Sequence, residues 1–358
     1  MTGVLKDRIS SAREYLERFG VDVMLFVDLS NIRYLCGFTG SEGVLVLTRE
    51  GGMFLTDSRY TTQAAQEVTQ FPSREYRGQL EGIASLVKES RVGRVGFESA
   101  CMPVAQFRSL SDVLPGVELV PIGTELAALR QVKDEQELEL LARSAEVASR
   151  SLLEICSEIR PGARERDVAL ALEFAMKRGG AEEKSFDFIV ASGVRGALPH
   201  GKASDRIIKA GELVTLDFGG IYQGYCSDET VTLAVGTPDE RQREIYGIVK
   251  EAHDLALAAV RPGVAFRELD AIARDFISAQ GYGEYFGHGL GHGVGLEIHE
   301  QPALSFRSAG EAEAGMVFTI EPGIYIPGWG GVRIEDTVVV TPDGFRTLTK
   351  VPKELMVL

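Results

Sequence analysis

The sequence predicts an α+β fold in which a region of two similar halves follows a smaller α/β domain. Ten residues occur twice in near-copy, Ala210–Gly219 and Ala314–Gly323, at an offset of 104 (321 − 217), and each copy carries an apolar strand-like run that ends on an acid. The tripeptide Arg160-Pro161-Gly162 returns as Arg261-Pro262-Gly263. The order of helix, loop rich in glycine and histidine, and strand hairpin therefore occurs twice along the chain.

Length and composition narrow the class of protein. A chain of 358 residues exceeds one ordinary domain, so we expect two. A net charge of −14 without a basic run disfavours a nucleic-acid or anionic-membrane partner. No segment approaches 18 continuous apolar residues, and the first residues lack the apolar core of a signal peptide. The four cysteines form no Cys-x-x-Cys pair, so we expect reduced thiols in a cytoplasmic protein.

Residues 1–125 alternate helix-like and strand-like patterns, which predicts the small α/β domain. The expected helices are 6–19, 57–68 and 80–89, and the expected strands are 21–27, 43–48, 53–56 and 94–97. The proline and glycine content around 121–132 places the boundary there, which gives domains 1–125 and 126–358.

The second region opens with a charged helix from Lys133 to about Ile159, which Arg160-Pro161-Gly162 stops. Each Arg-Pro-Gly is followed by a helix, Glu165–Lys177 and then Phe266–Ala279. The first hairpin is expected to join strands 213–218 and 225–235. His253 falls in a helical stretch, and we expect it to be an ordinary, partly exposed residue.

Four acids at the ends of the duplicated strands are the strongest candidates for a site: Asp217, Asp228, Glu321 and Glu335. A first turn centred between residues 222 and 223, and a second centred on residue 328, would set them opposite one another in two pairs. Opposed side chains have Cβ atoms about 4.5–5.5 Å apart, so these like charges repel unless a cation neutralises them. Two divalent cations would balance four carboxylates.

Two alternatives concern these acids. They could cap turns or form exposed ion pairs, but chance does not reproduce both their spacing and their flanks. Their neighbours Glu229 and Asp336 face the other side of the same strands, and a one-residue change in turn length would exchange the roles.

Four of the five histidines lie in glycine-rich loops: His200, His288, His292 and His299. The motif G-x-G-x-x-G is not formed, because its last glycine would fall on an even position such as His292. His-Glu-x-x-His is not formed either, because the run His299-Glu300-Gln301-Pro302-Ala303 ends on alanine. An oxygen-rich site with one imidazole suits Mn²⁺, Co²⁺ or Zn²⁺ better than a metal that prefers thiolates.

In order and context, five residues resemble the metal ligands of the "pita-bread" metallopeptidases, which include aminopeptidase P, prolidase and methionine aminopeptidase. They are Asp217, Asp228, His292, Glu321 and Glu335. The resemblance covers about residues 130–358, and residues 1–125 resemble the N-terminal domain of the Xaa-Pro branch through Tyr34–Ser41 and Thr56–Tyr60. It implies a site of two divalent ions, with Mn²⁺ expected ahead of Co²⁺ or Zn²⁺. Asp217 would hold one ion, Asp228 and Glu335 would bridge both, and His292 and Glu321 would complete the second.

The same resemblance assigns roles around the ions. It implies that Glu321 accepts a proton from the attacking water and passes it to the leaving nitrogen. His200 and His299 would contact the substrate and stabilise the tetrahedral intermediate, and His288 would line the same cleft. Arg333 and Tyr325 would orient the ligands.

The resemblance also implies a proline-containing peptide as substrate and a homodimer as the assembly. Dipeptide-restricted relatives often place an arginine shortly after His-Glu to hold the substrate carboxylate, and Ala303 stands there in this chain. We therefore expect an Xaa-Pro aminopeptidase, with Xaa-Pro dipeptidase (prolidase) as the alternative. A metal-free hydrolase of the creatinase type and a non-enzymatic binding protein of the same fold are the rival hypotheses.

Overall fold

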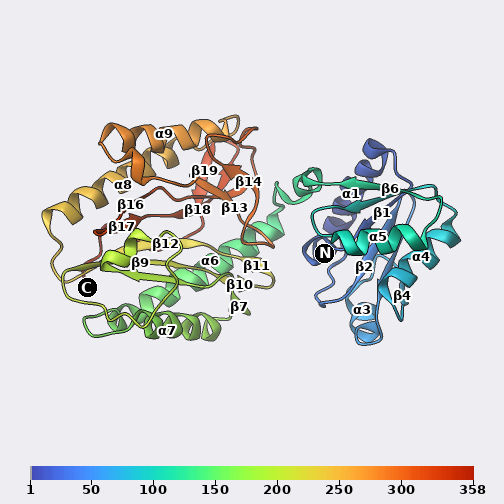
Figure 1. Ribbon diagram of the computed structural model, residues 1–358, viewed down its shortest axis with the longest axis horizontal. Helices are drawn as coiled ribbons and strands as arrows, with labels where there is room; N and C mark the ends of the chain where they lie inside the picture. Colours follow the sequence, from blue (N-terminus) through green and yellow to red (C-terminus); the bar gives the residue numbers. More distant parts are fainter. Residues whose placement is uncertain (1) are drawn as a thin grey trace. The chain divides into compact units, whose positions relative to one another are not determined.

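The computed structural model describes residues 2–358, which divide into two compact units, one reaching Arg130 and the other running from Gln131 to Leu358 (Figure 1). The boundary expected from the sequence, between residues 125 and 126, falls inside the 3-10 helix Thr124–Arg130 at the end of the first unit. The first unit is built on one sheet and the second on several, and each unit has its own buried apolar residues.

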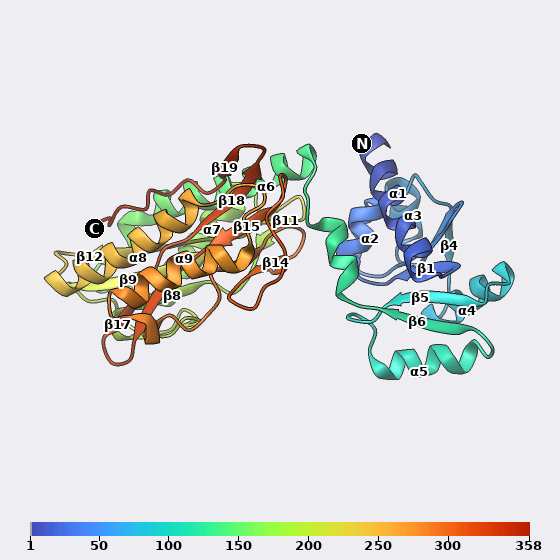
Figure 2. The same cartoon turned by 90° about the horizontal axis from the view of Figure 1, so that it is seen from above.

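The first unit is a six-stranded mixed sheet with the order β4-β3-β2-β1-β5-β6. Its strands are β1 (Val23–Phe26), β2 (Val44–Thr48), β3 (Gly52–Thr56), β4 (Ser73–Glu75), β5 (Arg94–Glu98) and β6 (Glu118–Ile122). Its helices are α1 (Thr2–Phe19), α2 (Leu29–Cys36), α3 (Thr61–Glu67), α4 (Gln79–Ser90) and α5 (Val104–Val113). Apolar residues of α4 and α5 pack on one face of the sheet, and α1 and α2 lie on the other (Figure 2).

Five elements of this unit were not predicted: α2, α5, β4, β6 and the 3-10 helix Thr124–Arg130. Helix α2 has eight residues, too few for a clear apolar period. The residues at its two ends are nevertheless typical helix caps. The Asp28 side chain accepts hydrogen bonds from Ser30 N and Asn31 N, and Gly37 follows the last residue at a φ of 80°.

The second unit holds four long helices: α6 (Glu135–Ile155), α7 (Glu165–Arg178), α8 (Glu240–Ala258) and α9 (Phe266–Ala279). Its first-half strands are β7 (Glu183–Lys184), β8 (Ile189–Ser192), β9 (Glu212–Phe218), β10 (Gly220–Tyr222), β11 (Tyr225–Cys226) and β12 (Glu229–Val235). Its second-half strands are β13 (Gly291–Gly293), β14 (Glu300–Leu304), β15 (Val317–Ile320), β16 (Gly323–Ile326), β17 (Gly330–Arg333), β18 (Asp336–Thr341) and β19 (Gly344–Thr347).

Each half of this unit buries its strands against its own pair of helices. Residues of α6 and α7 share one apolar core with β8, β9 and β12, while α8 and α9 share another with β15 to β18. The strands therefore lie between two helix layers (Figure 1). The halves meet along β12, where Glu335 N donates to Thr230 O (3.1 Å) and Thr232 Oγ1 donates to Arg333 O (2.9 Å).

The first hairpin pairs two residues away from the predicted register. Asp217 of β9 stands opposite Thr230, where the sequence led us to expect Asp228. The cause is the turn, because the chain reverses through Gln223 and Gly224, both at positive φ (46° and 80°), which suits a two-residue hairpin. A shift of two residues keeps every side chain on its predicted face, so Asp217 and Asp228 still line the same pocket.

The second hairpin keeps the predicted register. β15 pairs with β18, and β16 with β17, in one continuous register on either side of Glu321 and Glu335. This register sets the two glutamates opposite one another between the paired segments.

The prediction for His253 was wrong. It lies on α8 as expected, but its residue is only 1% exposed. Its Nε2 is 3.3 Å from Asp336 Oδ2 and its Nδ1 is 3.2 Å from Asp254 Oδ1. A helical pattern does not reveal which face a lone polar residue occupies. Separately, none of the helices in residues 2–358 combines the length and apolar character that crossing a membrane requires.

Candidate metal centre and active site

The predicted site residues of both halves surround one cavity of about 460 Å³ in the second unit. Every one of them except Tyr325 lines it: His200, Asp217, Asp228, His288, His292, His299, Glu321, Arg333 and Glu335. Phe186, Asp187, Ile189 and Lys202 also line it and were not predicted. Residues that lie more than 100 positions apart in the chain therefore share this pocket.

Asp228, His292 and Glu335 form a group that fits a metal ion. One ligand atom from each lies within 4.8 Å of the others. Two buried carboxylate oxygens of the pocket, Asp217 Oδ1 and Glu335 Oε1, have no hydrogen-bond partner in the described chain. Burying an unpartnered anionic oxygen is costly, so these atoms fit direct contact with a cation. The donor set of carboxylates with one imidazole suits a borderline divalent metal.

His292 is oriented as a neutral ligand. Its Nδ1 donates to Gly293 O (3.1 Å), which leaves Nε2 facing Asp228 Oδ2 at 3.5 Å and Glu321 Oε1 at 3.4 Å. Burial lowers the pKa of His292 below its ordinary value, so the ring carries no proton on Nε2 at neutral pH. The lone pair of Nε2 is therefore available to a metal.

The carboxylates of the pocket are buried close to one another, which changes their pKa values. Burial first, and then neighbouring carboxylates, raise the pKa of Asp228 and of Glu335 well above the ordinary range. Burial also raises the pKa of Glu321. Hydroxyl donors support two of these acids: Thr230 Oγ1 donates to Glu335 Oε2 (2.6 Å), and Thr319 Oγ1 donates to Glu321 Oε1 (3.1 Å). A bound cation would reverse the pKa shifts, because it stabilises the ionised forms.

Arg333 connects the two halves at the pocket wall. Its Nη2 donates to Asp217 Oδ2 (2.7 Å), its Nη1 to Tyr325 Oη (2.9 Å) and to Pro199 O (3.2 Å), and its Nε to Thr230 Oγ1 (3.1 Å). The residue is only 3% exposed, so these contacts are shielded from water. The guanidinium therefore fixes one carboxylate oxygen of Asp217 and leaves the other free for a metal.

Tyr325 and His288 continue this network. Because Arg333 donates to Tyr325 Oη, the hydroxyl can donate to His288 Nε2 at 2.9 Å, while His288 Nδ1 donates to Gly289 O at 2.7 Å. Burial lowers the pKa of His288 and raises the pKa of Tyr325 to about 12, which keeps both groups neutral. Both ring nitrogens of His288 are thus occupied by protein groups.

His200 and His299 differ from His288. Both are exposed on the pocket lining, and neither imidazole has a hydrogen-bond partner within residues 2–358. The His299 ring lies edge-on to the His292 ring, with 4.4 Å between centroids. Their nitrogens can therefore donate to a ligand in the pocket.

The two acids that alternate with Asp228 and Glu335 face away from the pocket. Glu229 and Asp336 share the ammonium of Lys353, at 2.6 Å and 3.4 Å. Ser149 Oγ and Val351 N also donate to Glu229, at 2.5 Å and 2.9 Å. The open question of which acid of each doublet enters the pocket is thereby answered by geometry.

The supporting hydroxyls could have been found in the sequence. Thr230 and Thr337 occupy matching places in the acidic repeat, and Thr215 and Thr319 in the longer one. Thr337 Oγ1 donates to Asp228 O (2.8 Å), and Thr215 Oγ1 bonds Thr232 Oγ1 (3.1 Å). Lys353 and Lys202 carry no such signal, because neither lies in a repeated run.

Two family models and several individual proteins are similar to this chain. The model of metallopeptidase family M24 matches residues 139–342, and that of the creatinase/prolidase N-terminal domain matches residues 8–132. An Xaa-Pro dipeptidase of Pyrococcus furiosus is 41% identical over 355 residues, which cover 98% of this chain and 100% of that protein.

Two solved structures are similar along their whole length. An Xaa-Pro dipeptidase from Bacillus anthracis has a TM-score of 0.96 at 43% identity, and the match covers 99% of this chain and 100% of that one. An X-Pro aminopeptidase from Thermotoga maritima has a TM-score of 0.89 at 39% identity, with 97% and 100% covered.

Proposed function

Because this chain belongs to metallopeptidase family M24 and carries the creatinase/prolidase N-terminal domain, we propose that it is an Xaa-Pro dipeptidase dependent on two divalent metal ions. The observation that carries the proposal is the pocket, where Asp228, His292 and Glu335 converge and two buried carboxylate oxygens have no hydrogen-bond partner among the described residues. The dipeptide preference is favoured over our sequence-based expectation of an aminopeptidase by the similarity to the Xaa-Pro dipeptidases of Pyrococcus furiosus and Bacillus anthracis.

Five residues would hold the ions: Asp217, Asp228, His292, Glu321 and Glu335. When bound, the ions supply Lewis acidity, which activates water at neutral pH and polarises the scissile carbonyl. Mn²⁺ is proposed ahead of Co²⁺ and Zn²⁺, since the donor set is mainly carboxylate oxygen.

The surrounding side chains divide the remaining work. Glu321, whose pKa is raised by burial, would accept a proton from water and deliver it to the proline nitrogen that leaves. His200 and His299, whose nitrogens have no hydrogen-bond partner within residues 2–358, would donate to the substrate and to the developing oxyanion. Arg333 holds Asp217, and Tyr325 fixes the His288 ring.

An Xaa-Pro aminopeptidase is the second candidate, favoured by position 303. Ala303 stands directly opposite His292 in the β13–β14 pair and is exposed. A methyl group at this place leaves no charge to hold a substrate carboxylate next to the ligands. The similarity to the Thermotoga maritima X-Pro aminopeptidase fits this reading.

A rate comparison tests the proposal and separates the two candidates. Metal-free protein reloaded with Mn²⁺ would be given an Xaa-Pro dipeptide, its C-terminal amide and an Xaa-Pro-Yaa tripeptide. A dipeptidase cleaves the free dipeptide at the highest kcat/KM, whereas an aminopeptidase prefers the tripeptide and tolerates the amide. Two outcomes would overturn the metallopeptidase assignment. One is full activity after exhaustive chelation, and the other is that protein with two metals bound cleaves none of the three peptides.

Metal analysis tests the two rival hypotheses, and light scattering tests the oligomeric state. A metal-free hydrolase or a non-enzymatic binding protein would retain no metal after dialysis, whereas we expect about two ions per chain. We propose that the protein acts in the cytoplasm, since no disulfide joins its cysteines within residues 2–358. We also propose a homodimer, the assembly that the resemblance to the Xaa-Pro branch implies. Light scattering of the purified chain would check the dimer.

A further inference from the structure

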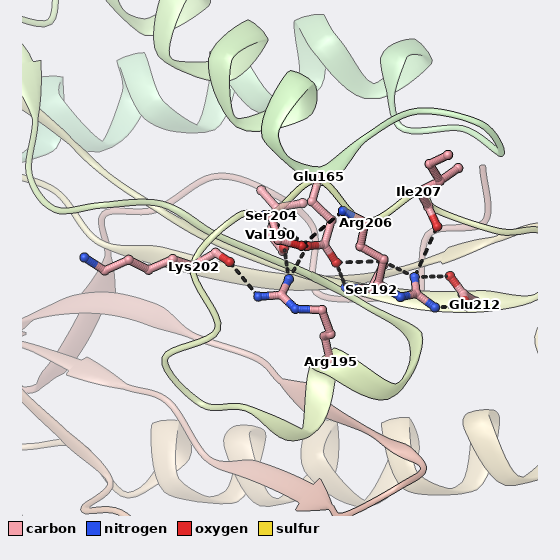
Figure 3. Close-up of polar contacts among 9 residues, drawn as sticks. All are labelled: Glu165, Val190, Ser192, Arg195, Lys202, Ser204, Arg206, Ile207 and Glu212. Atoms are coloured by element: carbon pink, nitrogen blue, oxygen red, sulfur yellow. Dashed lines mark hydrogen bonds and ion pairs between the residues drawn. The ribbon is translucent and has the colours of Figure 1, made fainter.

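A fully buried acid lies at the start of α7, behind the pocket wall. Glu165 has 0% exposure and accepts four hydrogen bonds from two serines: from Ser192 N and Oγ, both at 2.8 Å, and from Ser204 N and Oγ, at 3.2 Å and 2.6 Å. The Arg195 guanidinium pairs with the same carboxylate (Figure 3). A buried carboxylate is tolerated only with such a set of donors, so Glu165 is a fixed point of this region.

The groups bound to Glu165 enclose the loop that carries His200. Ser192 ends β8 and Ser204 follows the loop, so one carboxylate holds both ends. Arg195, inside the loop, also donates from Nη2 to Lys202 O at 2.7 Å. Figure 3 shows the Lys202 side chain directed away from this cluster. The loop thus has its ends and its middle anchored, while His200 and Lys202 line the pocket.

The second half contains a comparable arrangement on α9, the duplicated counterpart of α7. Asp270 has 0% exposure, and Arg274, one turn later, donates to both of its oxygens from Nε and Nη2 at 2.8 Å. Arg274 also donates to Phe286 O (2.9 Å) and His288 O (2.7 Å), and Leu290 N donates to Asp270 Oδ1 (3.1 Å). Here the anchored loop carries His288.

The two devices share a principle but not their residues. In the first half the arginine comes from the loop and the acid from the helix, whereas in the second half both come from the helix. The contacts of Glu165 and Arg195 within the described chain include none of the five proposed metal ligands. Their effect on the pocket is therefore confined to the histidine-bearing wall.

We propose that the Glu165–Arg195 pair is a positioning device for His200, and that the Asp270–Arg274 pair does the same for His288. The proposal rests on the function proposed above in one respect, since that function has His200 donate to the substrate. Displacing a group that contacts substrate by about 1 Å costs on the order of 100-fold in rate. A loop released from its anchor loses that precision without losing metal.

The first test reads the histidines directly and needs neither metal nor substrate. The chain has only five histidines, so the imidazole Cε1–H signals of isotopically labelled, metal-free protein can be assigned by single His→Gln substitutions. We expect Glu165→Gln to shift or broaden the His200 signal and to leave the His288 signal in place. Asp270→Asn should do the reverse. Unmoved signals in both variants would overturn the proposal.

A matched control lies in the same cluster. Glu212 pairs with Arg206, at 2.5 Å and 2.7 Å, next to Ser192 (Figure 3). Glu212→Gln removes the same charge without touching Arg195 or Ser204, so His200 should keep its signal. An equal shift in this variant would mean that the cluster acts only through general stability.

The second test measures turnover. With Mn²⁺ restored, Glu165→Gln should lower kcat/KM by about 10- to 100-fold while retaining the metal content of the wild type. If this variant fails to fold, Arg195→Gln can replace it, because this change removes the hydrogen bond to Lys202 O and keeps the four hydrogen bonds from the serines. It should likewise lower kcat/KM and leave the metal content unchanged. A lowered melting temperature with unchanged kcat/KM and an unchanged His200 signal would overturn positioning. If the signals move but no Xaa-Pro peptide is cleaved by wild type, the proposed function fails and the positioning stands.

Discussion

The two halves of the second unit place their acids by different means. The first half uses aspartates on a hairpin with a two-residue turn, whose register staggers Asp217 and Asp228. The second half uses glutamates, which a continuous register sets opposite one another. What both halves retain is the face of the strand on which each acid lies. The comparison teaches that alternation along a strand, which has a period of two, is the property that a duplicated metal site must keep.

The sharpest way to break this comparison is to remove one carboxylate from each half. We expect Asp228→Asn and Glu335→Gln each to lower the number of bound metal ions and to reduce kcat by about a thousandfold or more, because metal ions supply several kcal/mol of transition-state stabilisation. Metal analysis and steady-state kinetics check this. The exposed acid Asp343, changed to Asn, is the control. Full metal content in either variant would mean that this half does not contribute to the site.

The next largest effect concerns the faces that point away from the pocket. Glu229 and Asp336, one from each half, share Lys353. Lys353→Met leaves the buried Glu229 without its cation and Asp336 with the imidazole of His253 but no ammonium, which should lower the free energy of unfolding by about 3–5 kcal/mol. Chemical denaturation measures this value. Lys350→Met, at an exposed position nearby, should change it little, and equal values for the two variants would refute the role of Lys353.

Arg333 tests whether the halves act as one site. It belongs to the second half but donates to Asp217 of the first. We expect Arg333→Met to reduce metal affinity or kcat/KM by about 10- to 100-fold, the usual effect of removing a residue that orients a ligand. Arg333→Lys should recover part of the loss. A variant with wild-type metal affinity and kcat/KM would show that Asp217 needs no partner from the other half.

The dependence on pH follows from the raised pKa values of Asp228, Glu321 and Glu335. A raised pKa in the folded state means that protonation stabilises the fold, so metal-free protein should lose stability as pH rises above the ordinary carboxyl range of about 4. Metal requires the ionised forms, so the rise in melting temperature on adding Mn²⁺ should grow as the pH rises above the ordinary carboxyl range. Calorimetry with and without Mn²⁺ measures both trends. Glu335→Gln should flatten them, and a rise independent of pH would contradict the assignment.

The smallest expected effect concerns β14, the strand of the second half that pairs with the His292-bearing β13. Ala303→Arg places a cation opposite this ligand. We expect the ratio of kcat/KM for an Xaa-Pro dipeptide to that for a tripeptide to rise by about tenfold, because a held carboxylate is worth about 1.5–3 kcal/mol before desolvation costs. Ala303→Gln, of similar length and no charge, is the control, and an equal ratio in both variants would remove position 303 from the specificity argument.

Features that depend on residues close together in the sequence could be predicted, and features that depend on distant residues could not. The two strand–acid runs and their faces were predictable, because each is a local pattern that the second copy confirms within the same sequence. The partner of Asp217 was not, because it depends on the backbone angles of Gln223 and Gly224. Glu165 gave no signal either. Its importance arises only when Ser192 and Ser204 reach it from elsewhere in the chain.

The same reasoning explains His253. A histidine on a helix is usually half exposed, and only the arrival of Asp336 from β18 makes its burial acceptable. Short elements such as α2 were missed because eight residues carry too little periodicity. In each case the deciding contact is one that no window of neighbouring residues contains.

The position of Lys353 in the chain has a consequence for biosynthesis. Its ammonium neutralises an acid from each half, yet it follows both halves in the sequence. Until residue 353 has been synthesised, Glu229 lacks this ammonium and Asp336 has the imidazole of His253, but not this ammonium, beside it. The contact that joins an acid of each half through one ammonium is therefore among the last that the growing chain can form.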